Sequence, residues 1–401
     1  MSAGLVAGLL MNFDFLRPFN FYEFFAGGGM ARLGLGDTWN CLFANDFDAK
    51  KAASYRANFG GAPEFLHEDV RSITSSRLPS KATLAWASFP CQDLSLAGPG
   101  AGLAGERSGV FWPFWNLMLS LKREQRNPPI IALENVAGLI TSHNGQDLTN
   151  LISSLVAADY RVGAVLVDGA YFVPQSRPRL FIVAVARGVV IPKGISGRVP
   201  NPSWHPKSLQ DVVEGLPPKV RKAWIWWKMP TPKHEAPHLS DIIEDIPHGV
   251  EWHSVAETTK LLAMMTPANV EKVREAQNSG IRQVGTIYRR TRNNMQRAEV
   301  RFDGVSGCLR TPAGGSSRQI IMVVEGQRIR SRLISPRETA RLMGLPETYC
   351  LPDRYNDAYH LTGDGVVVPA VEWLEQHIIR PIAISAYYPK NQKRMPEVEF
   401  A

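Results

Sequence analysis

The sequence predicts an α/β fold: a mostly parallel sheet covered by helices, with a second, smaller domain that is irregular or β-rich. Three observations support this prediction. Strand-like and helix-like segments alternate through the first half of the chain. After Arg187 the composition changes, and Pro, Trp and His become frequent. The chain has 401 residues, beyond the roughly 250–300 at which one core usually stops growing, so two domains are expected.

The strands expected in the first domain are apolar runs that stop at glycine, proline or polar residues. They cover Phe19–Phe25, Trp39–Asn45, Thr83–Ser88, Ile130–Leu133, Arg161–Asp168 and Arg179–Ala186. A helix is expected over about residues 48–58, and an apolar helix over residues 366–379 could rejoin this domain. In open parallel sheets, ligands bind beyond the carboxyl ends of the strands. Asp46, Cys91 and Glu134 all fall at such ends.

The composition is typical of a soluble globular protein. Hydrophobic residues make up 44% and charged residues 20% of the chain, too apolar a balance for disorder. Lys and Arg number 45 against 37 Asp and Glu, and this net charge of +8 suits a polyanionic partner without establishing one. The apolar start, Met1–Leu10, has no Lys or Arg before it, and no stretch approaches the roughly 18–20 apolar residues that cross a membrane. A cytoplasmic protein is expected.

The chain has four cysteines, far apart and without a C-x-x-C pair: Cys41, Cys91, Cys308 and Cys350. This spacing argues against a disulfide scaffold and a cysteine-rich zinc site, so no metal is expected, and it fits a reducing compartment. Cys91 follows Pro90 at a strand end and precedes residues 98–109, which contain five glycines. A thiol at the rim of a crevice beside a mobile segment is typical of a nucleophile, although a lone cysteine is more often a core residue.

A glycine loop, Phe25–Gly29 (FAGGG), follows the first strand. Such a loop lets the backbone pass close to a ligand, although the same glycines also form plain tight turns. Asp46 closes the next strand, where it would either accept hydrogen bonds from ribose hydroxyls or cap the following helix. The loop lacks both the G-K-[ST] of a phosphate-binding NTPase and the full G-x-G-x-x-G, which favours a nucleoside cofactor without a pyrophosphate.

Charged residues at two further strand ends extend the candidate crevice. Glu134 closes its strand, where a carboxyl group is either a surface acid that caps the next turn or a buried, protonated hydrogen-bond donor. The segment 175–179 (QSRPR) places Arg177 and Arg179 at alternate positions of an extended chain, hence on one side of it. They are either two solvated surface residues or two cations that face the same crevice and hold an anion or a carbonyl oxygen.

Taken in order, these motifs resemble those of the DNA cytosine-5 methyltransferase family. Residues 25–29 are similar to its cofactor motif, and Phe89-Pro90-Cys91-Gln92 with Ser95 and Ala97-Gly98 to its catalytic motif. Residues 134–136 match its ENV motif, and residues 175–179 match its Q-x-R-x-R motif. Residues 332–342 match its R-L-x-[ST]-P-R-E…A-R-L segment, and the turn at residues 363–366 lies where the family has G-N-A-V. The resemblance covers about residues 19–380, except a stretch between about 190 and 300 where members diverge.

The resemblance implies a Rossmann-like methyltransferase domain over residues 1–190 that binds S-adenosyl-L-methionine. A target-recognition domain over 191–354 would bind double-stranded DNA, and residues 355–401 would return to the catalytic domain. The implied activity is that of a site-specific DNA (cytosine-5-)-methyltransferase. Cys91 would attack carbon 6 of a cytosine flipped out of the duplex, and carbon 5 would receive the methyl group.

The resemblance also assigns roles to individual residues. The catalytic residues would be Cys91, Glu134, Arg177 and Arg179, with Glu134 at nitrogen 3 of the base and Arg179 at its carbonyl oxygen. The cofactor would be held by Phe25, Ala26, Gly27, Gly29, Asp46, Asp69 and Pro90; Phe25 would pack against the adenine, Asp46 would hold the ribose and Asp69 the adenine amine. DNA would be bound by Gln92, Ser95, Arg289, Arg290 and Arg292. Six arginines and a single acid between residues 282 and 301 suit phosphate positioning and guanine readout.

Three places depart from the family's pattern. Met30 stands where another glycine is common, Asp364 and Gly365 replace the Asn and Ala of G-N-A-V, and Cys308 stands where a Thr is common. Asp364 introduces a carboxylate close to the Cys91 segment and is expected to alter its tuning. No base contact is assigned to Cys308.

Two alternatives share this fold: an RNA-directed cytosine-5 methyltransferase and a catalytically silent DNA-binding regulator. About 110 variable residues with clustered arginines favour duplex DNA, and the intact catalytic set argues against a silent protein. The protein is expected to be a monomer of bacterial or phage type that acts alone or beside a cognate restriction endonuclease at the same site.

Overall fold

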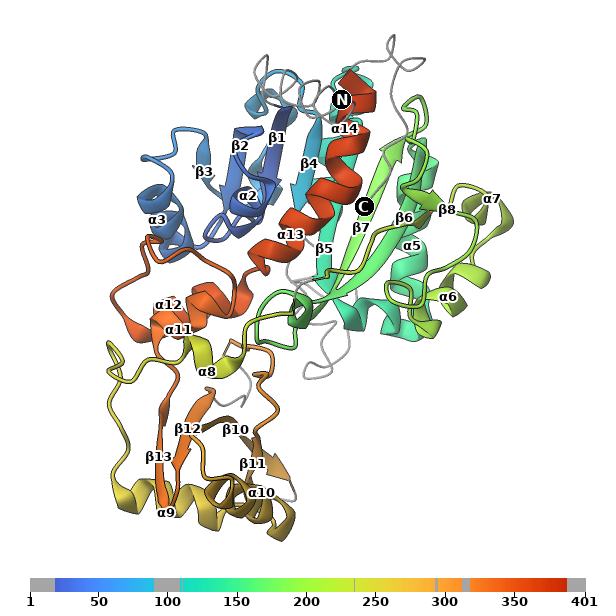
Figure 1. The fold of residues 1–401 in the computed structure, drawn as a ribbon. Coiled ribbons are helices and arrows are strands. Elements are labelled where there is room, and N and C mark those ends of the chain that lie inside the picture. Colours follow the sequence, from blue (N-terminus) through green and yellow to red (C-terminus); the bar gives the residue numbers. More distant parts are fainter. Residues whose placement is uncertain are drawn as a thin grey trace, which may run out of the picture.

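The computed structural model describes residues 19–89, 109, 111–233, 235–292, 295–311 and 318–387. In this part of the chain there are two units, a large one built on a seven-stranded sheet and a small one built on a four-stranded sheet (Figure 1). The small unit lies beyond the end of the large sheet, and helices lie between the two units (Figure 1). Among the described residues, no helix is both long and apolar enough to cross a membrane.

The large sheet has the strand order β3-β2-β1-β4-β5-β7-β6, in which β7 runs antiparallel to the other six strands. Its strands are β1 (Phe19–Phe24), β2 (Trp39–Asp46), β3 (Phe65–His67), β4 (Leu84–Ala87), β5 (Ile130–Val136), β6 (Tyr160–Asp168) and β7 (Pro178–Ala186). All six expected strands are present, and β3 is additional. Strand β7 follows β6 in the sequence and lies between β5 and β6 in the sheet. A short connection is enough here, because antiparallel neighbours need no crossover helix. The expected α/β fold is confirmed.

Helices cover both faces of this sheet, as parallel strands require. One face is covered by α2 (Met30–Leu35), α3 (Ala49–Asn58), α13 (Val368–Leu374) and α14 (Arg380–Tyr387), and the other by α4 (Phe111–Arg123) and α5 (Gln146–Ala157). Neighbouring strand residues therefore belong to different cores: Phe21 packs on the first side and Tyr22 on the second. A π-helical turn, Glu375–Ile379, joins α13 to α14, so the helix expected over residues 366–379 begins later and continues further.

The segment over residues 195–229 packs along the β6 edge of the large sheet. It contains β8 (Ser196–Gly197), α6 (Lys207–Glu214), α7 (Pro218–Arg221) and β9 (Trp226–Trp227). Val162 of β6 donates to the carbonyl oxygen of Ala223 (3.0 Å) and accepts from the N–H of Ile225 (2.8 Å). Trp204 and Trp227 are buried here as core residues. The change of composition after Arg187 thus marks a stretch that covers the edge of the large unit and not the beginning of the small unit.

The small unit is an antiparallel sheet with two helices on one face. Its strands, in the order β11-β10-β12-β13, are β10 (Gln283–Arg292), β11 (Met295–Arg301), β12 (Ile320–Glu325) and β13 (Arg328–Leu333), and its helices are α9 (Val255–Ala263) and α10 (Pro267–Asn278). Leu261 and Val273 of the helices pack against Ile287 of the sheet. Ser254 and Glu257 form a capping box that starts α9, and Pro267 starts α10.

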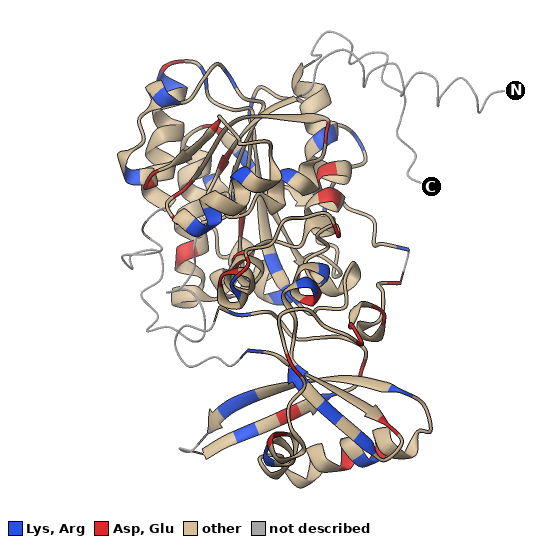
Figure 2. Ribbon diagram, turned by 90° about the vertical axis from the view of Figure 1, so that its left-hand side faces the viewer, with Lys and Arg blue, Asp and Glu red and all other residues tan. Residues whose placement is uncertain are grey.

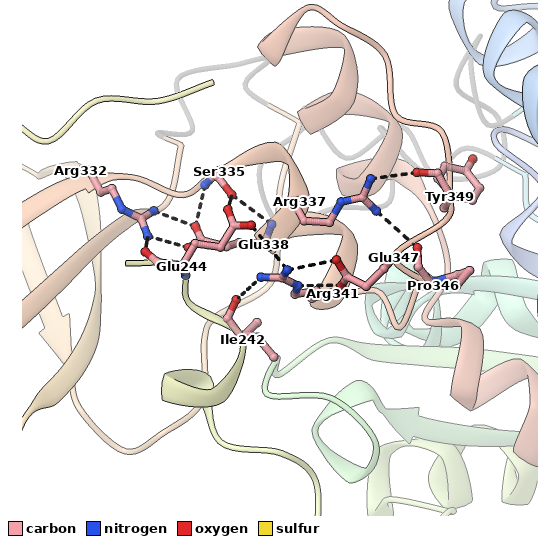
Figure 3. Close-up of polar contacts among 10 residues, drawn as sticks. All are labelled: Ile242, Glu244, Arg332, Ser335, Arg337, Glu338, Arg341, Pro346, Glu347 and Tyr349. Carbon is pink, nitrogen blue, oxygen red and sulfur yellow. Dashed lines mark hydrogen bonds and ion pairs between the residues drawn. The ribbon is translucent and has the colours of Figure 1, made fainter. Parts of the chain in front are cut away.

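A buried ion-pair network joins the two units at α8 (Leu239–Ile242) and α11 (Pro336–Arg341), and α12 (Tyr355–Asp364) packs beside α11, with the hydroxyl of Thr362 donating to that of Thr339 at 3.0 Å. The guanidinium of Arg332, in β13, donates to both oxygens of Glu338 in α11 at 2.6 and 2.7 Å, and both side chains are 0% exposed. The carboxylate of Glu338 also accepts from the N–H groups of Ser335 and Glu244, each at 2.7 Å. Figure 3 shows the network continuing to Arg341 and from there to the α8 segment.

Candidate active site

The glycine loop lies at the carboxyl end of β1, directly before α2 (Figure 1). The backbone is left-handed at Phe25 (φ 56°), Gly27 (φ 55°) and Gly29 (φ 77°). A Cβ on Gly29 would lie 2.2 Å from a ring carbon of Phe59, so only glycine fits there. A Cβ on Gly27 would meet no atom within 4 Å. The loop therefore presents bare backbone to open space at a strand end.

Asp46, the last residue of β2, is hydrogen-bonded to this loop. Its two carboxylate oxygens accept from the N–H groups of Gly27 and Asp48, each at 2.9 Å, and the residue is only 6% exposed. Burial raises the pKa of this carboxyl group, opposed in part by the positive charge of Lys51 and by the two N–H donors. The glycine loop and Asp46, predicted separately from the sequence, thus lie together.

An exposed aromatic ring lies directly after Asp46. The residue is Phe47, 67% exposed, and its carbonyl oxygen is 2.9 Å from Nε2 of His67 at the end of β3. Asp69 follows β3, accepts from the N–H of Arg71 (2.8 Å) and keeps its carboxylate at the surface. The sequence analysis missed Phe47, although an apolar residue right after the acid at a strand end was an available signal.

The segment expected to hold the nucleophile, with Pro90, Cys91, Gln92 and Ser95, lies outside the described residues. The structure does place Phe89, which leads into it from β4. Phe89 is buried, its ring packs against that of Phe111 with centroids 5.3 Å apart, and its carbonyl oxygen accepts from Nδ2 of Asn135 at 3.2 Å. Since Asn135 follows Glu134 in β5, Phe89 lies beside the strand end that carries Glu134.

Glu134 and Arg179 form an ion pair at neighbouring strand ends. Nε of Arg179 is 3.1 Å from Oε1 of Glu134, and the side chains are only 14% and 9% exposed. They meet because β5 and β7 are antiparallel, with Arg179 opposite Val136. A carboxyl group and a guanidinium side by side, largely shielded from water, suit a planar ring that offers a ring nitrogen next to a carbonyl oxygen.

Arg177 is directed away from this pair and into the protein. Its guanidinium, 1% exposed, donates to the carbonyl oxygens of Gly363 and Gly365 (both 2.7 Å) and of Leu309 (2.9 Å). The sequence analysis placed Arg177 and Arg179 on one side of an extended chain. Regular strand geometry begins only at Pro178, so the alternation does not reach Arg177. Arg177 thus joins three chain segments, and its catalytic role stays a prediction.

A buried carboxyl group lies in β1, below the glycine loop. Glu23 is 0% exposed, and its oxygens accept from the hydroxyl of Tyr55 (3.0 Å) and the N–H of Arg32 (3.3 Å). Burial raises the pKa of Glu23 to about 7, against the lowering effects of Tyr55 and Arg32. The sequence analysis did not select Glu23, although an acid inside an apolar strand was a visible signal.

Because of Glu23, the free energy of unfolding should fall as the pH rises through about 7. The pKa of this carboxyl group in the unfolded chain is about 4.3. Between this pKa and the folded pKa of about 7, the folded protein binds one more proton than the unfolded chain. This stability is fully present below the window and lost above it. Relative to wild type, Glu23→Gln should gain about 2–3 kcal/mol between about pH 5 and about pH 8, measured by urea unfolding.

The control for this experiment is Glu124→Gln. Hydrogen bonds from Ser75 and Arg126 lower the pKa of this exposed carboxyl group, so it should affect the pH dependence in the opposite sense and weakly. If Glu23→Gln follows the wild-type curve at every pH, the carboxyl group of Glu23 does not hold its proton near neutrality.

Two departures from the family's pattern compensate each other. A Cβ on Gly365 would lie 2.2 Å from Sδ of Met30, the first residue of α2. Met30 is 2% exposed and fills the space that the family's usual alanine would need at position 365. Methionine in place of glycine at position 30 thus occurs together with glycine in place of alanine at position 365.

Gly365→Ala is expected to lower the free energy of unfolding by about 1–2 kcal/mol through overpacking against Met30. The double variant with Met30→Ala should be more stable than the sum of the two single effects predicts, since the shorter side chain leaves room. Denaturant unfolding measures all three, and Gly188→Ala, where a Cβ meets no atom within 4 Å, is the control. Strict additivity would mean that the two positions do not share space.

The arginines expected to contact DNA lie in β10 of the small unit, and Figure 2 shows Lys and Arg along the strands of this sheet. Neighbouring strand residues face opposite sides, so Arg289 shares the side of the buried Ile287, toward the helices, and Arg290 the other side. Arg290 is exposed, with Nε 3.8 Å from Glu299. The side chain of Arg292 lies outside the described residues.

Known proteins share both the sequence pattern and the fold. Residues 19–380 match the family of C-5 cytosine-specific DNA methylases. The chain is 24% identical over 362 residues to the Type II methyltransferase M1.ScrFI of Lactococcus lactis subsp. cremoris, covering 89% of this chain and 77% of that protein. It is 23% identical over 365 residues to the Type II methyltransferase M.HhaI of Haemophilus parahaemolyticus, covering 90% and 95%.

The fold is similar to that of the S. pombe Dnmt2 methyltransferase, with a TM-score of 0.56 and 17% identity over 90% of this chain and 99% of that one. A methyltransferase encoded within an E. coli prophage is similar at a TM-score of 0.56 and 16% identity, over 91% and 99%. The match to the family extends from the first strand of the large sheet to the start of α14, and the chain therefore belongs to the C-5 cytosine-specific DNA methylases.

Proposed function

We propose that the protein is a site-specific enzyme that methylates carbon 5 of cytosine in double-stranded DNA, with S-adenosyl-L-methionine as methyl donor. The observation that carries this proposal is the shielded Glu134–Arg179 pair, beside the strand end that leads into Cys91. Membership of the DNA methylase family supports the same reaction.

The cofactor would be held by residues that end or follow β1, β2, β3 and β4: Phe25, Ala26, Gly27, Gly29, Asp46, Asp69 and Pro90, to which we add Phe47. The described residues fit an adenosine: open backbone at Gly27, a buried carboxylate at Asp46 and an exposed ring at Phe47. Carboxylates suit ribose hydroxyls, and an aromatic face suits a purine. When bound, the sulfonium supplies an electrophilic methyl group.

The chain's own residues would make cytosine reactive at carbon 5. The thiolate of Cys91 attacks carbon 6 of the ring, and negative charge then develops over nitrogen 3 and the carbonyl oxygen. The carboxyl O–H of Glu134 would donate a hydrogen bond to nitrogen 3 and the guanidinium of Arg179 would donate to the oxygen, so the pair would stabilise the charge where it forms. Carbon 5 would then be nucleophilic enough to accept the methyl group, and loss of its proton to solvent would expel Cys91 as a thiolate and restore the ring. Stacked bases cannot reach these groups, so the cytosine must leave the duplex.

Target recognition is assigned to the small unit and the segment around Cys91. Arg290 and Arg292 of β10 would contact the duplex, and Gln92 and Ser95 would contact the base. Arg289 lies on the helix side of the strand and is therefore less well placed than Arg290 to reach the DNA. The net charge of +8 supports binding to phosphates. The enzyme would act as a monomer in the cytoplasm, and its Type II relatives favour a cognate restriction endonuclease as a partner.

The proposal is tested by methyl transfer from labelled S-adenosyl-L-methionine. Plasmid DNA should accept label and tRNA should not, and bisulfite sequencing of DNA from an expressing host should give the site. A duplex with 5-fluorocytosine at that site should trap a covalent adduct, because carbon 5 then has no proton to lose. Label on tRNA alone would favour an RNA-directed enzyme, and no transfer to either nucleic acid by folded, cofactor-bound protein would contradict the proposal.

A further inference from the structure

Several hydrogen bonds hold the 363–365 turn, which consists of the last two residues of α12, Gly363 and Asp364, and the capping residue Gly365. Its Asp364 replaces the asparagine that is usual in this family. Nζ of Lys51, in α3, donates to Oδ2 of Asp364 at 2.8 Å, and the hydroxyl of Thr311 donates to its other oxygen. Both oxygens of the carboxylate therefore accept a hydrogen bond. One accepts from Lys51, on the cofactor side of the large unit, and the other from Thr311, in the segment that leads toward the small unit.

The same turn is tied to the residues proposed to hold the base. Arg177 holds the carbonyl oxygens of Gly363 and Gly365, and its other nitrogen holds that of Leu309. Arg177 lies two residues before Arg179, which pairs with Glu134. A shift of the turn would therefore move the backbone from which Arg179 extends.

Lys51 also connects the turn to the cofactor side. Its side chain is only 22% exposed, and it is the cation that most opposes the raised pKa of Asp46. Burial lowers the pKa of Lys51, but the charges of Asp364 and Asp46 outweigh it and raise the pKa. Burial raises the pKa of Asp364, but Lys51 and Thr311 outweigh it and lower the pKa. Both groups therefore carry their charges at neutral pH.

We propose that Lys51 and Asp364 form a positioning pair that fixes the 363–365 turn between the cofactor side, Thr311 and Arg177, and so sets the geometry of the Glu134–Arg179 pair. The inference rests on the proposed function. The carboxylate of Asp364 needs a positive partner that a neutral asparagine at this position would not need, and Lys51 supplies this partner.

The test is a double-mutant cycle with Lys51→Met, Asp364→Asn and both together. Lys51→Met leaves a carboxylate without its counter-charge beside the turn, and kcat for DNA methylation should fall about tenfold. The dissociation constant of S-adenosyl-L-methionine should rise by less than kcat falls, because the glycine loop remains and Asp46, although it loses the charge that most opposes its raised pKa, keeps its two N–H donors. Asp364→Asn keeps one oxygen that can accept from Lys51, and the hydroxyl of Thr311 can turn to accept from the new amide NH2, so the change should cost less than about threefold in kcat.

The double variant carries the decisive prediction. With no uncompensated carboxylate left, it should recover kcat to within about threefold of Asp364→Asn, and unfolding experiments should show the same non-additivity. A neighbouring pair gives the matched control: Nζ of Lys50, also in α3, is 2.7 Å from Asp357 of α12. Lys50→Met removes a link between the same two helices without touching the turn, so kcat should be unchanged.

Equal kcat values for Lys51→Met and Lys50→Met would overturn the positioning role, as would a double variant no more active than Lys51→Met. Failure of the proposed function gives a different result, because wild type itself would then transfer no methyl group to DNA. In that case, additivity of Lys51→Met and Asp364→Asn in unfolding would still show that the two residues do not act as a pair.

Discussion

Cys91→Ser is expected to lower the rate of methyl transfer to DNA by at least about a thousandfold, because a hydroxyl is a far weaker nucleophile than a thiol near neutral pH. The groups that would hold the base, Glu134 and Arg179, remain in place, and so do the arginines of the small unit. Affinity for DNA and for S-adenosyl-L-methionine should therefore stay within about threefold of wild type. Labelled methyl transfer and DNA-binding titrations measure the two quantities separately.

A second sulfur near the same pair provides the sharpest control. Sγ of Cys308 is 3.1 Å from Nη1 of Arg177. Burial raises the pKa of this thiol, but the charges of Arg177, Arg179 and Arg310 outweigh that effect and bring the pKa below its ordinary value. Cys308 is thus the other candidate nucleophile, yet Cys308→Ser should keep activity within about tenfold of wild type. Loss of activity in Cys308→Ser, together with an active Cys91→Ser, would show that the nucleophile is misassigned.

Much of the large unit could be predicted because its strands are buried on both faces and read as short apolar runs. Their carboxyl ends then place the glycine loop and Asp46 at one edge, and the structure joins these two by a hydrogen bond. The reversal of β7 and the position of residues 195–229 could not be read in the same way. Strand order and edge packing depend on contacts between distant residues, and composition does not encode them.

The candidate site shows the same division between local and distant contacts. Glu134 could be placed from its strand, whereas the orientation of Arg177 depends on the carbonyl oxygens of Gly363 and Gly365, far along the chain. The departures at Met30 and Asp364 looked unrelated in the sequence. Each has a partner only in three dimensions: Gly365 for the first and Lys51 for the second.

Arg332→Met is expected to lower the free energy of unfolding by about 3–5 kcal/mol. Arg332 and Glu338 are both 0% exposed, and the guanidinium bonds both carboxylate oxygens (Figure 3). Removing Arg332 leaves a buried carboxylate whose remaining donors, the N–H groups of Ser335 and Glu244, do not neutralise its charge. Urea unfolding, followed by circular dichroism, measures the loss.

An exposed pair in the same network gives the control for this prediction. Glu347, 62% exposed, is paired with Arg341 at 2.8 Å, and Glu347→Gln should change stability by less than about 1 kcal/mol. Adding Glu338→Gln to Arg332→Met removes the unpaired charge and keeps an oxygen for one of the two backbone donors, so the double variant should be more stable than Arg332→Met alone. A loss in Arg332→Met no larger than that in Glu347→Gln would mean that Glu338 does not depend on Arg332, and the two units would then be held together mainly by their apolar contacts.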